Sequence, residues 1–156
     1  KLKDIDDAIT LSIMAGLAFS LIETFIYAYL AGDMSLIIYR AFLSIPVHIV
    51  ASGIFGYYYG LAHFAKPLVK ANSEEKTYRI NLKWLHKILT LKKSTIYEEE
   101  KIMEGLFLAT FFHAVCNILF ELNVAFIVVP ILVLGLLALS YLYKKSHILY
   151  RLIHAR

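Results

Sequence analysis

Histidine, glutamate and asparagine side chains recur at helical spacing inside apolar stretches of this sequence. The segment FFHAVCNILFEL, residues 111–122, holds His113, Asn117 and Glu121 among Phe, Leu, Ile and Val. Residues four apart share one face of a helix, so these three form a polar stripe. Imidazole, amide and carboxylate groups on one face are suited to acid–base catalysis or to metal binding.

Two earlier apolar stretches repeat this design. One face of the first carries Phe19, Glu23 and Tyr27, and Gly16 lies beside them. One face of the second carries four residues in i, i+4 steps: His48, Ser52, Gly56 and Gly60. Gly105 continues the third stripe. Small residues let membrane helices approach closely, so we expect the glycines to pack the helices together and the polar groups to meet.

Three of the ionisable groups are predicted to lie at similar depths. An ionisable side chain in hydrocarbon costs roughly 2.5–3.5 kcal/mol on insertion scales, so it normally faces the bundle interior. Counted at about 1.5 Å per residue from the outer helix ends, Glu23 lies about 10 Å deep, His113 about 12 Å and His48 about 18 Å. We therefore expect one site in the outer half of the membrane. A carboxylate and two imidazoles in a low dielectric activate water or hold a metal ion such as zinc.

Four apolar blocks supply the helices that must position these groups. The chain has 156 residues and is 60% hydrophobic, its mean hydropathy is +0.66, and a bilayer span needs about 20 residues. The blocks cover residues 8–30, 36–65, 102–122 and 123–143. The sequence predicts an all-α fold, a polytopic membrane helix bundle with about four transmembrane helices in a single domain of residues 1–156. Short connections near residues 32–35 and 121–123 predict antiparallel hairpins.

Positive charge is concentrated on one side of the predicted membrane. Nine of the sixteen Lys and Arg residues fall within residues 66–101, four follow the last block and two precede the first. The positive-inside rule therefore predicts a multi-pass cell-membrane protein with both termini and the long loop in the cytoplasm. Arg40 is left for the outer side, where it would anchor the topology, pair with Glu121 or take part in catalysis.

The sizeable segment outside the spans is a predicted cytoplasmic insert at residues 66–100. Within it, RINLKWLHKILTLKK (residues 79–93) sets apolar residues against lysines, as an amphipathic helix does. We expect it either to lie on anionic lipid headgroups or to cap the bundle as an ordinary surface helix. No nucleic-acid partner is expected, and the sequence does not specify an oligomeric state. The single cysteine, Cys116, is expected to fill apolar space.

Three motifs in this order resemble the PrsW family of intramembrane proteases, within the CAAX protease superfamily. The segments GLAFSLIETFIY, RAFLSIPVHIVASGIFGYYYG and HAVCN resemble the second, third and fourth motifs of that family. The matched positions are Phe19, Glu23, Tyr27, Arg40, His48, Ser52, Gly56, Gly60, His113 and Asn117. The CAAX prenyl proteases share the His-xxx-Asn element but carry His where this chain has Glu23, so the PrsW side of the superfamily is favoured.

The resemblance implies an intramembrane endopeptidase that cleaves membrane-anchored proteins with activated water. Glu23 would be the base or a partner of the histidines, His48 and His113 would polarise the water and the tetrahedral oxyanion, and Asn117 would position them. Four residues would support them: Phe19, Tyr27, Arg40 and Ser52. Four glycines would pack the helices: Gly16, Gly56, Gly60 and Gly105. Glu23, His48 and His113 permit a divalent metal such as zinc but do not require one.

The first motif of the PrsW family has no counterpart in this sequence. That motif is a Glu-Glu-xxx-basic element on a helix before the Phe-xxx-Glu span, and no Glu-Glu pair precedes Glu23. The chain also begins with Lys1 rather than Met. We expect it either to be the C-terminal part of a longer enzyme or to be an inactive relative.

Two other functions fit the same residues. A non-catalytic scaffold or binding protein of the same fold would keep the stripes for helix packing. A b-type haem protein would use His48 and His113 as axial ligands. The identity of the substrate and its cleavage site are not encoded in these motifs.

Overall fold

The computed structural model describes residues 2–32, 35–75, 92–122 and 124–154. These ranges contain helices and no strand, and the helices are α1 (Ile5–Ala31), α2 (Ser35–His63), α3 (Ala65–Glu75), α5 (Lys93–Glu121) and α6 (Ala125–His154). The predicted all-α fold is therefore confirmed.

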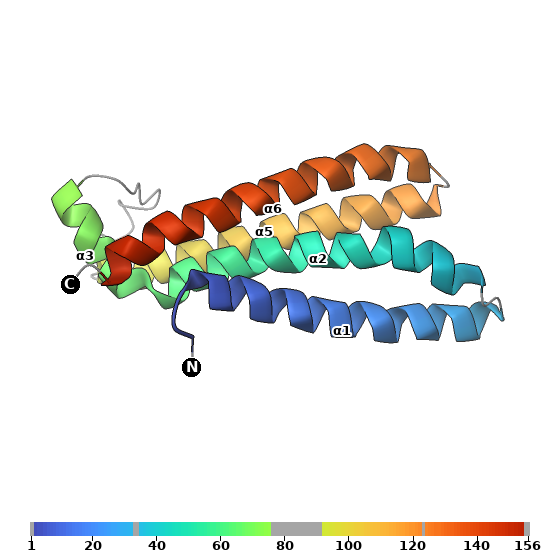
Figure 1. Cartoon of the computed structure of the whole chain (residues 1–156), viewed down its shortest axis with the longest axis horizontal. Helices are drawn as coiled ribbons and strands as arrows, with labels where there is room; N and C mark the ends of the chain where they lie inside the picture. The colour runs from blue at the N-terminus through green and yellow to red at the C-terminus, as the bar shows by residue number, and fades with distance from the viewer. Residues whose placement is uncertain (1, 33–34, 76–91, 123, 155–156) are drawn as a thin grey trace.

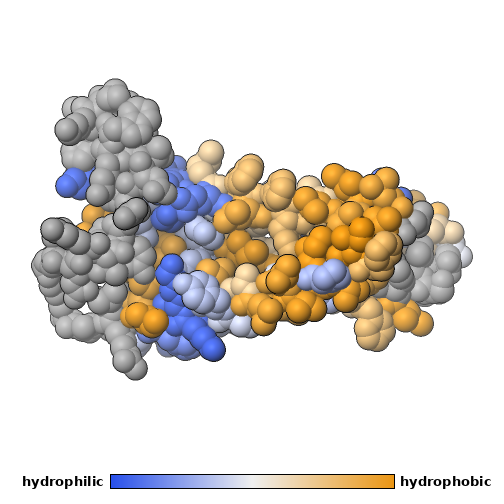
Figure 2. Space-filling view, turned by 90° about the horizontal axis from the view of Figure 1, so that it is seen from above, coloured by the Kyte–Doolittle hydropathy of each residue, from blue (hydrophilic) through white to orange (hydrophobic). Residues whose placement is uncertain are grey.

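Four of these helices are long and apolar enough to cross a membrane: α1, α2 over Arg40–His63, α5, and α6 over Phe126–Tyr150. They run side by side along the long axis of the molecule (Figure 1). Both chain ends and α3 lie at one end, which we call the near end, and the two short connections lie at the other, the far end. Figure 2 shows hydrophilic side chains gathered toward the near end and hydrophobic side chains over most of the remaining face. The four-span prediction is thus confirmed.

Local interactions define both ends of α1. The side chain of Asp4 accepts a hydrogen bond from the backbone N–H of Asp7 at 2.8 Å, which caps the helix N-terminus. At the other end Gly32 adopts a left-handed conformation with φ of 65°, and its N–H bonds to the Tyr29 carbonyl. Glycine takes this conformation without a Cβ clash. The chain can therefore stop one helix and start α2 within a few residues, which makes the first antiparallel hairpin.

The central helix of the bundle is α2. In its most apolar stretch 44% of the residues are buried inside the bundle, against 11–22% in the corresponding stretches of the other three spans. Close approaches at glycine make this possible: a Cβ added at Gly56 would lie 2.7 Å from Ile9 Cα, and one at Gly105 would lie 2.5 Å from Tyr58 Cβ. Gly16 and Gly60 likewise face α2 and α1 side chains or backbone. Both α1 and α5 pack on α2, but among the described residues no Cα of α1 lies within 8 Å of one in α5.

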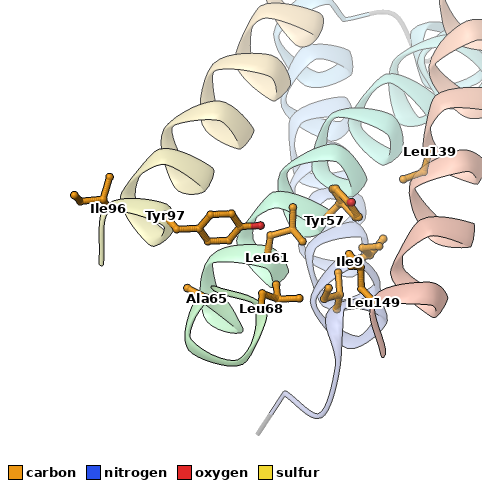
Figure 3. Close-up of a cluster of buried hydrophobic side chains, with 10 residues drawn as sticks. Ile9, Tyr57, Leu61, Ala65, Leu68, Ile96, Tyr97, Leu139 and Leu149 are labelled. Atoms are coloured by element: carbon orange, nitrogen blue, oxygen red, sulfur yellow. The ribbon is translucent and has the colours of Figure 1, made fainter. Parts of the chain in front are cut away.

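Two apolar clusters hold the helices together. The larger one lies at the near end and joins all the described helices (Figure 3): Ile5, Ile9, Tyr57, Leu61, Ala65, Leu68, Ile96, Tyr97, Leu139 and Leu149. The smaller cluster lies between α2, α5 and α6: Val47, Cys116, Val128 and Leu132. Cys116 is fully buried there, as a small apolar side chain would be.

Helix boundaries differ from the predicted spans. The helix that contains the third predicted span begins at Lys93, before residue 102, and α6 runs from Ala125 to His154, beyond residue 143. The predicted insert at 66–100 contains α3 and the first turns of α5. The charged first turns of α5 remain helical. There Lys101 pairs with Glu100 and Glu104 on the same helix. The amphipathic segment predicted at residues 79–93 lies, apart from its last two residues, outside the described residues.

Candidate functional site

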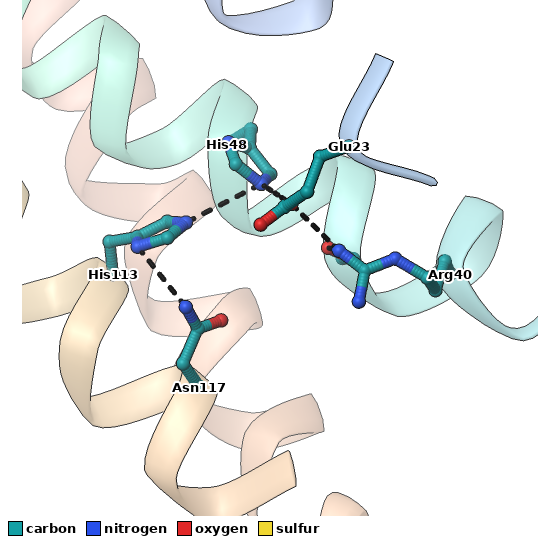
Figure 4. A network of polar contacts seen from close by, with 6 residues as sticks. Glu23, Arg40, His48, His113 and Asn117 are labelled. Atoms are coloured by element: carbon teal, nitrogen blue, oxygen red, sulfur yellow. Dashed lines mark hydrogen bonds and ion pairs between the residues drawn. The ribbon is translucent and has the colours of Figure 1, made fainter. Parts of the chain in front are cut away.

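A chain of polar contacts crosses three helices in the far half of the bundle (Figure 4). Glu23 of α1 contacts two residues of α2, with its Oε2 2.7 Å from Arg40 Nη2 and 3.0 Å from His48 Nε2. His48 Nε2 lies 3.4 Å from His113 Nε2 of α5. His113 Nδ1 lies 3.4 Å from Asn117 Nδ2. The groups predicted to meet from separate spans therefore do meet.

Helix packing explains how Glu23 reaches this position. The buried face of α1 over this half carries small or short side chains, Gly16, Ser20, Thr24 and Ala28. These let α1 lie close against α2, and Glu23, next to Thr24, stands at the edge of that contact. The hydroxyls of Ser20 and Thr24 are buried and have no hydrogen-bond partner among the described residues. Sequence analysis did not single out Thr24.

Arg40 balances the charge of Glu23. Its Nη2 also donates to Ser44 Oγ at 3.1 Å, and its guanidinium carbon lies 4.3 Å from the centre of the Tyr27 ring. A cation over an aromatic face is favourable, more so away from water. Glu121, the other predicted partner, is exposed at the end of α5. Ser44 was missed by sequence analysis, although its position one turn after Arg40 was a usable signal.

His48 is the junction of the network. The residue is only 5% exposed, and its ring lies 5.7 Å from that of Phe19 and 4.6 Å from that of His113, centre to centre. A haem iron takes its axial ligands from opposite faces of the porphyrin. The edge contact between the two imidazoles leaves no space for a porphyrin between them, so this arrangement does not suit the b-type haem alternative.

Proton placement in this network depends on Asn117. A neutral imidazole carries one proton, on either nitrogen. If Asn117 Nδ2 donated to His113 Nδ1, the single proton of neutral His113 would be on Nε2 and would point at His48 Nε2. His48 Nε2 would then be the acceptor and would carry no proton to donate to Glu23. An amide turned by 180° exchanges its nitrogen and oxygen. With its oxygen toward His113, Asn117 accepts from Nδ1–H, the His113 Nε2 lone pair faces the junction, and His48 Nε2–H donates to Glu23.

His48 and His113 alone suit a metal ion better than Glu23, His48 and His113 do together. Two nitrogen ligands on a tetrahedral zinc lie about 3.3–3.4 Å apart, which matches the 3.4 Å between His48 Nε2 and His113 Nε2. The third donor, Glu23 Oε2, is shared with Arg40. Among the described residues no three His, Cys, Asp or Glu side chains are already grouped as a metal site. Glu23 would have to loosen its contact with Arg40 to become a third ligand.

A groove of about 440 Å³ adjoins the histidine pair. It lies between α1 and α5, its floor is α2, and His48 and His113 stand at its far end. Most wall residues are small: Ser12, Ala15, Gly16, Ala51, Ser52 and Ala109. Ser52 therefore lines the groove rather than joining the contact network, and Phe19 stands between the two.

Comparison with known proteins gives one match. The family model described as PrsW family intramembrane metalloprotease matches residues 1–142. That range includes the whole contact network and every residue that lines the groove. Neither a curated protein nor a solved structure matches the chain.

Proposed function

Because the chain belongs to the PrsW family of intramembrane metalloproteases, we propose that it hydrolyses a peptide bond of a membrane-anchored protein. The observation that carries this proposal is the unbroken contact path from Glu23 through His48 and His113 to Asn117, drawn from three spans and placed at the end of a groove. Packing alone does not explain such a path, because each polar group in a span carries an insertion cost.

In the proposed mechanism, Glu23 and His48 act together as the base. A water at the far end of the groove gives a proton to this pair, and its oxygen attacks the carbonyl carbon of the substrate. His113, held by Asn117, accepts a hydrogen bond from the attacking water through its Nε2 lone pair. Once Glu23 has taken the proton of the water, His48 Nε2–H donates to the tetrahedral oxyanion. The proton then passes from Glu23, through His48, to the amide nitrogen as the C–N bond breaks. Arg40 keeps the negative charge of Glu23 balanced between turnovers.

A divalent cation such as zinc belongs to this proposal as well. His48 and His113 would hold it, with Glu23 as the third donor, and it would act as a Lewis acid on the carbonyl and on water. The protein groups around it set its affinity, so calorimetric zinc titration provides a test without an activity readout. We expect His113→Ala, which removes a direct ligand, to weaken zinc binding by more than the roughly 10–100-fold that follows the loss of a ligand's outer-shell partner. Unchanged binding would remove the metal from the proposal.

The near end is proposed to face the cytoplasm of the cell that makes the protein. Lys and Arg gather in residues 66–101 and after the last span, which is the charge pattern of cytoplasmic loops. The contact network then lies in the outer half of the membrane. Labelling of single cysteines at each end in intact cells, with an impermeant reagent, would test this orientation.

The decisive experiment is a cleavage assay with the full-length protein in liposomes against a panel of single-span membrane proteins. We expect His113→Ala to abolish cleavage while the helical circular dichroism and the melting temperature stay close to those of the wild type. Ala114→Leu, a lipid-exposed change at the neighbouring position, is the matched control. Full cleavage by His113→Ala would rule out the proposed mechanism and favour a binding or scaffold role.

A further inference from the structure

His48 packs into a hole on the surface of α1 that has four residues at its corners. Residues at i, i+3, i+4 and i+7 of a helix form such a hole, and here they are Gly16, Phe19, Ser20 and Glu23. A Cβ added at Gly16 would lie 3.2 Å from the His48 carbonyl oxygen. The Phe19 ring lies 5.7 Å from the His48 ring, centre to centre, and Glu23 Oε2 lies 3.0 Å from His48 Nε2. Ser20 is the fourth corner, which places its side chain beside His48.

The polar contacts of His48 leave one nitrogen of its ring unused. The contacts with Glu23 and with His113 both involve Nε2 (Figure 4), and in the described part of the chain no polar contact involves Nδ1. When Nε2–H donates to Glu23, the neutral imidazole carries its lone pair on Nδ1. That lone pair requires a hydrogen-bond donor on the Nδ1 side of the ring.

The hydroxyl of Ser20 is a donor of the required kind. Ser20 is fully buried, its Oγ has no hydrogen-bond partner among the described residues, and buried hydroxyls normally find one. A serine in a helix can donate to the carbonyl four residues before it, here that of Gly16, but that bond would leave His48 Nδ1 without a donor. Donation to Nδ1, directly or through one ordered water, pairs the hydroxyl and the imidazole at once.

We propose that Ser20 is a positioning residue, whose hydroxyl donates to His48 Nδ1 and so keeps the imidazole proton on Nε2. The catalytic meaning of this inference rests on the proposed protease function. In the proposed mechanism, His48 Nε2–H donates first to Glu23 and then to the oxyanion, and it finally delivers a proton to the amide nitrogen. In the other tautomer Nε2 would present a lone pair to the carboxylate and to the oxyanion, and it would repel both.

Thr24 provides a matched control on the same face of α1. It is buried like Ser20, and its hydroxyl also has no hydrogen-bond partner among the described residues. It lies one turn farther along α1, outside the hole that holds His48. Ser20→Ala and Thr24→Val therefore each remove one buried hydroxyl with little change of shape, and only the first variant removes one beside His48.

Nitrogen NMR reports the position of the imidazole proton without any activity measurement. The sample is the full-length protein with ¹⁵N-labelled histidine, kept free of metal by a chelator at mildly alkaline pH, where imidazole is neutral. The chain has six histidines, and the spectrum of His48→Gln identifies the two signals that belong to His48. A protonated and an unprotonated ring nitrogen have well-separated chemical shifts, so the spectrum shows which nitrogen carries the proton.

We expect the wild type to show one tautomer of His48, with the proton on Nε2 and with Nδ1 as a hydrogen-bond acceptor. Ser20→Ala should show a mixture of both tautomers, and Thr24→Val should keep the wild-type pattern. A proton on Nδ1 in the wild type, an unchanged pattern in Ser20→Ala, or the same change in Thr24→Val would each overturn the inference.

Kinetics on a single-span substrate in liposomes test the catalytic meaning of the contact. Losing the group that orients an imidazole through its second nitrogen costs about 10–100-fold at metal sites, and we expect kcat of Ser20→Ala to fall by a similar factor with KM close to that of the wild type. Equal losses in Ser20→Ala and Thr24→Val would overturn the inference, because the hydroxyls would then only pack the helices. If the wild type shows the expected tautomer but cleaves nothing, the protease proposal fails and the contact between Ser20 and His48 stands. Cleavage with the proton of His48 on Nδ1 would do the reverse.

Discussion

The near end and the far half of the bundle use charge in different ways. At the near end, Lys101 pairs with Glu100 and Glu104, which lie one and three residues away on the same helix, at 3.2 and 2.6 Å. In the far half, His113 and His48 are 65 residues apart in sequence, and His48 and Glu23 are 25 apart. The near-end pairs form as soon as α5 forms, whereas the far network exists only when three helices have assembled.

The difference indicates which charges the fold needs and which charges a function needs. At the near end, α1 is tied to α6 by Asp6, which accepts from Ser146 and lies 3.1 Å from His147 Nδ1. His147 is 71% exposed, so water shares that contact and its stability contribution is small. Glu23 and Arg40 are 21% and 17% exposed in the far half of the bundle and join two helices, whereas the more buried Lys101 and Glu100 pair within one helix. Four mutations test this contrast between the two regions.

The largest expected effect comes from the carboxylate of the far network. Glu23→Gln keeps the shape of the side chain but removes the base, so the cleavage rate should fall by about 10²–10⁴-fold. Glu104→Gln makes the same change at the near end and should leave the rate close to that of the wild type. The measurement is the cleavage rate of each variant on one single-span substrate in liposomes. If both variants lost activity equally, the carboxylates would act through the fold and not through chemistry.

The next effect is on stability. Arg40→Met leaves the Glu23 carboxylate without its guanidinium in an apolar setting, and the free energy of unfolding should fall by about 2–4 kcal/mol. The double variant Arg40→Met with Glu23→Gln should recover part of this loss, because no unpaired charge then remains. Unfolding in mixed micelles measures all three variants. Additive losses in the double variant would show that the pair is not coupled.

Asn117 provides a sharper test of the far network than simple removal. Asn117→Leu removes the acceptor for His113 Nδ1–H and should lower the cleavage rate by about 10–100-fold. Asn117→Asp retains an oxygen acceptor and should keep most of the activity. A ranking in which Asp is as poor as Leu would mean that the amide nitrogen donates, contrary to the proton placement described above.

The smallest expected effect belongs to Ser44. Ser44→Ala removes one hydrogen bond to Arg40, which still contacts Glu23 and Tyr27. Stability should fall by about 1 kcal/mol, with little change in cleavage. Ser140→Ala, at an exposed hydroxyl that donates to the Leu136 carbonyl of its own helix, is the matched control. A large loss of activity in Ser44→Ala would assign Ser44 a more direct part in the site.

Sequence alone predicted the helical stripes because a helix repeats every 3.6 residues. His113 and Asn117 share a face whatever packs against it, and so do His48 and Ser52. Periodicity does not state which helices are neighbours. The central place of α2, the separation of α1 from α5 and the groove between them depend on contacts such as Gly56 against Ile9, which no single stripe encodes.

The helices extend beyond the predicted spans. Hydropathy marks only the apolar part of a helix, so the third span was placed from residue 102, whereas the helix that contains it, α5, begins at Lys93. The 29 residues of α5 extend about 44 Å, beyond a hydrocarbon core of about 30 Å. Buried Lys101, with carboxylates one residue before and three residues after it, carries the helix through this polar stretch.

The contact of α1 with α2 is close at more than one level, and this fixes the position of Glu23. Added Cβ atoms at Gly60, Gly56 and Gly16 would lie 2.8 Å from Ile5 Cγ2, 2.7 Å from Ile9 Cα and 2.7 Å from Ser52 Cβ. From Ile5 to Glu23 the helix is about 27 Å long, so a tilt of about 4° about Ile5 would displace Glu23 by about 2 Å. The contact at Gly16 and the tight turn at Gly32 oppose such a tilt. The 3.0 Å contact between Glu23 and His48 therefore has the tolerance of the whole helix pair and not that of one side chain.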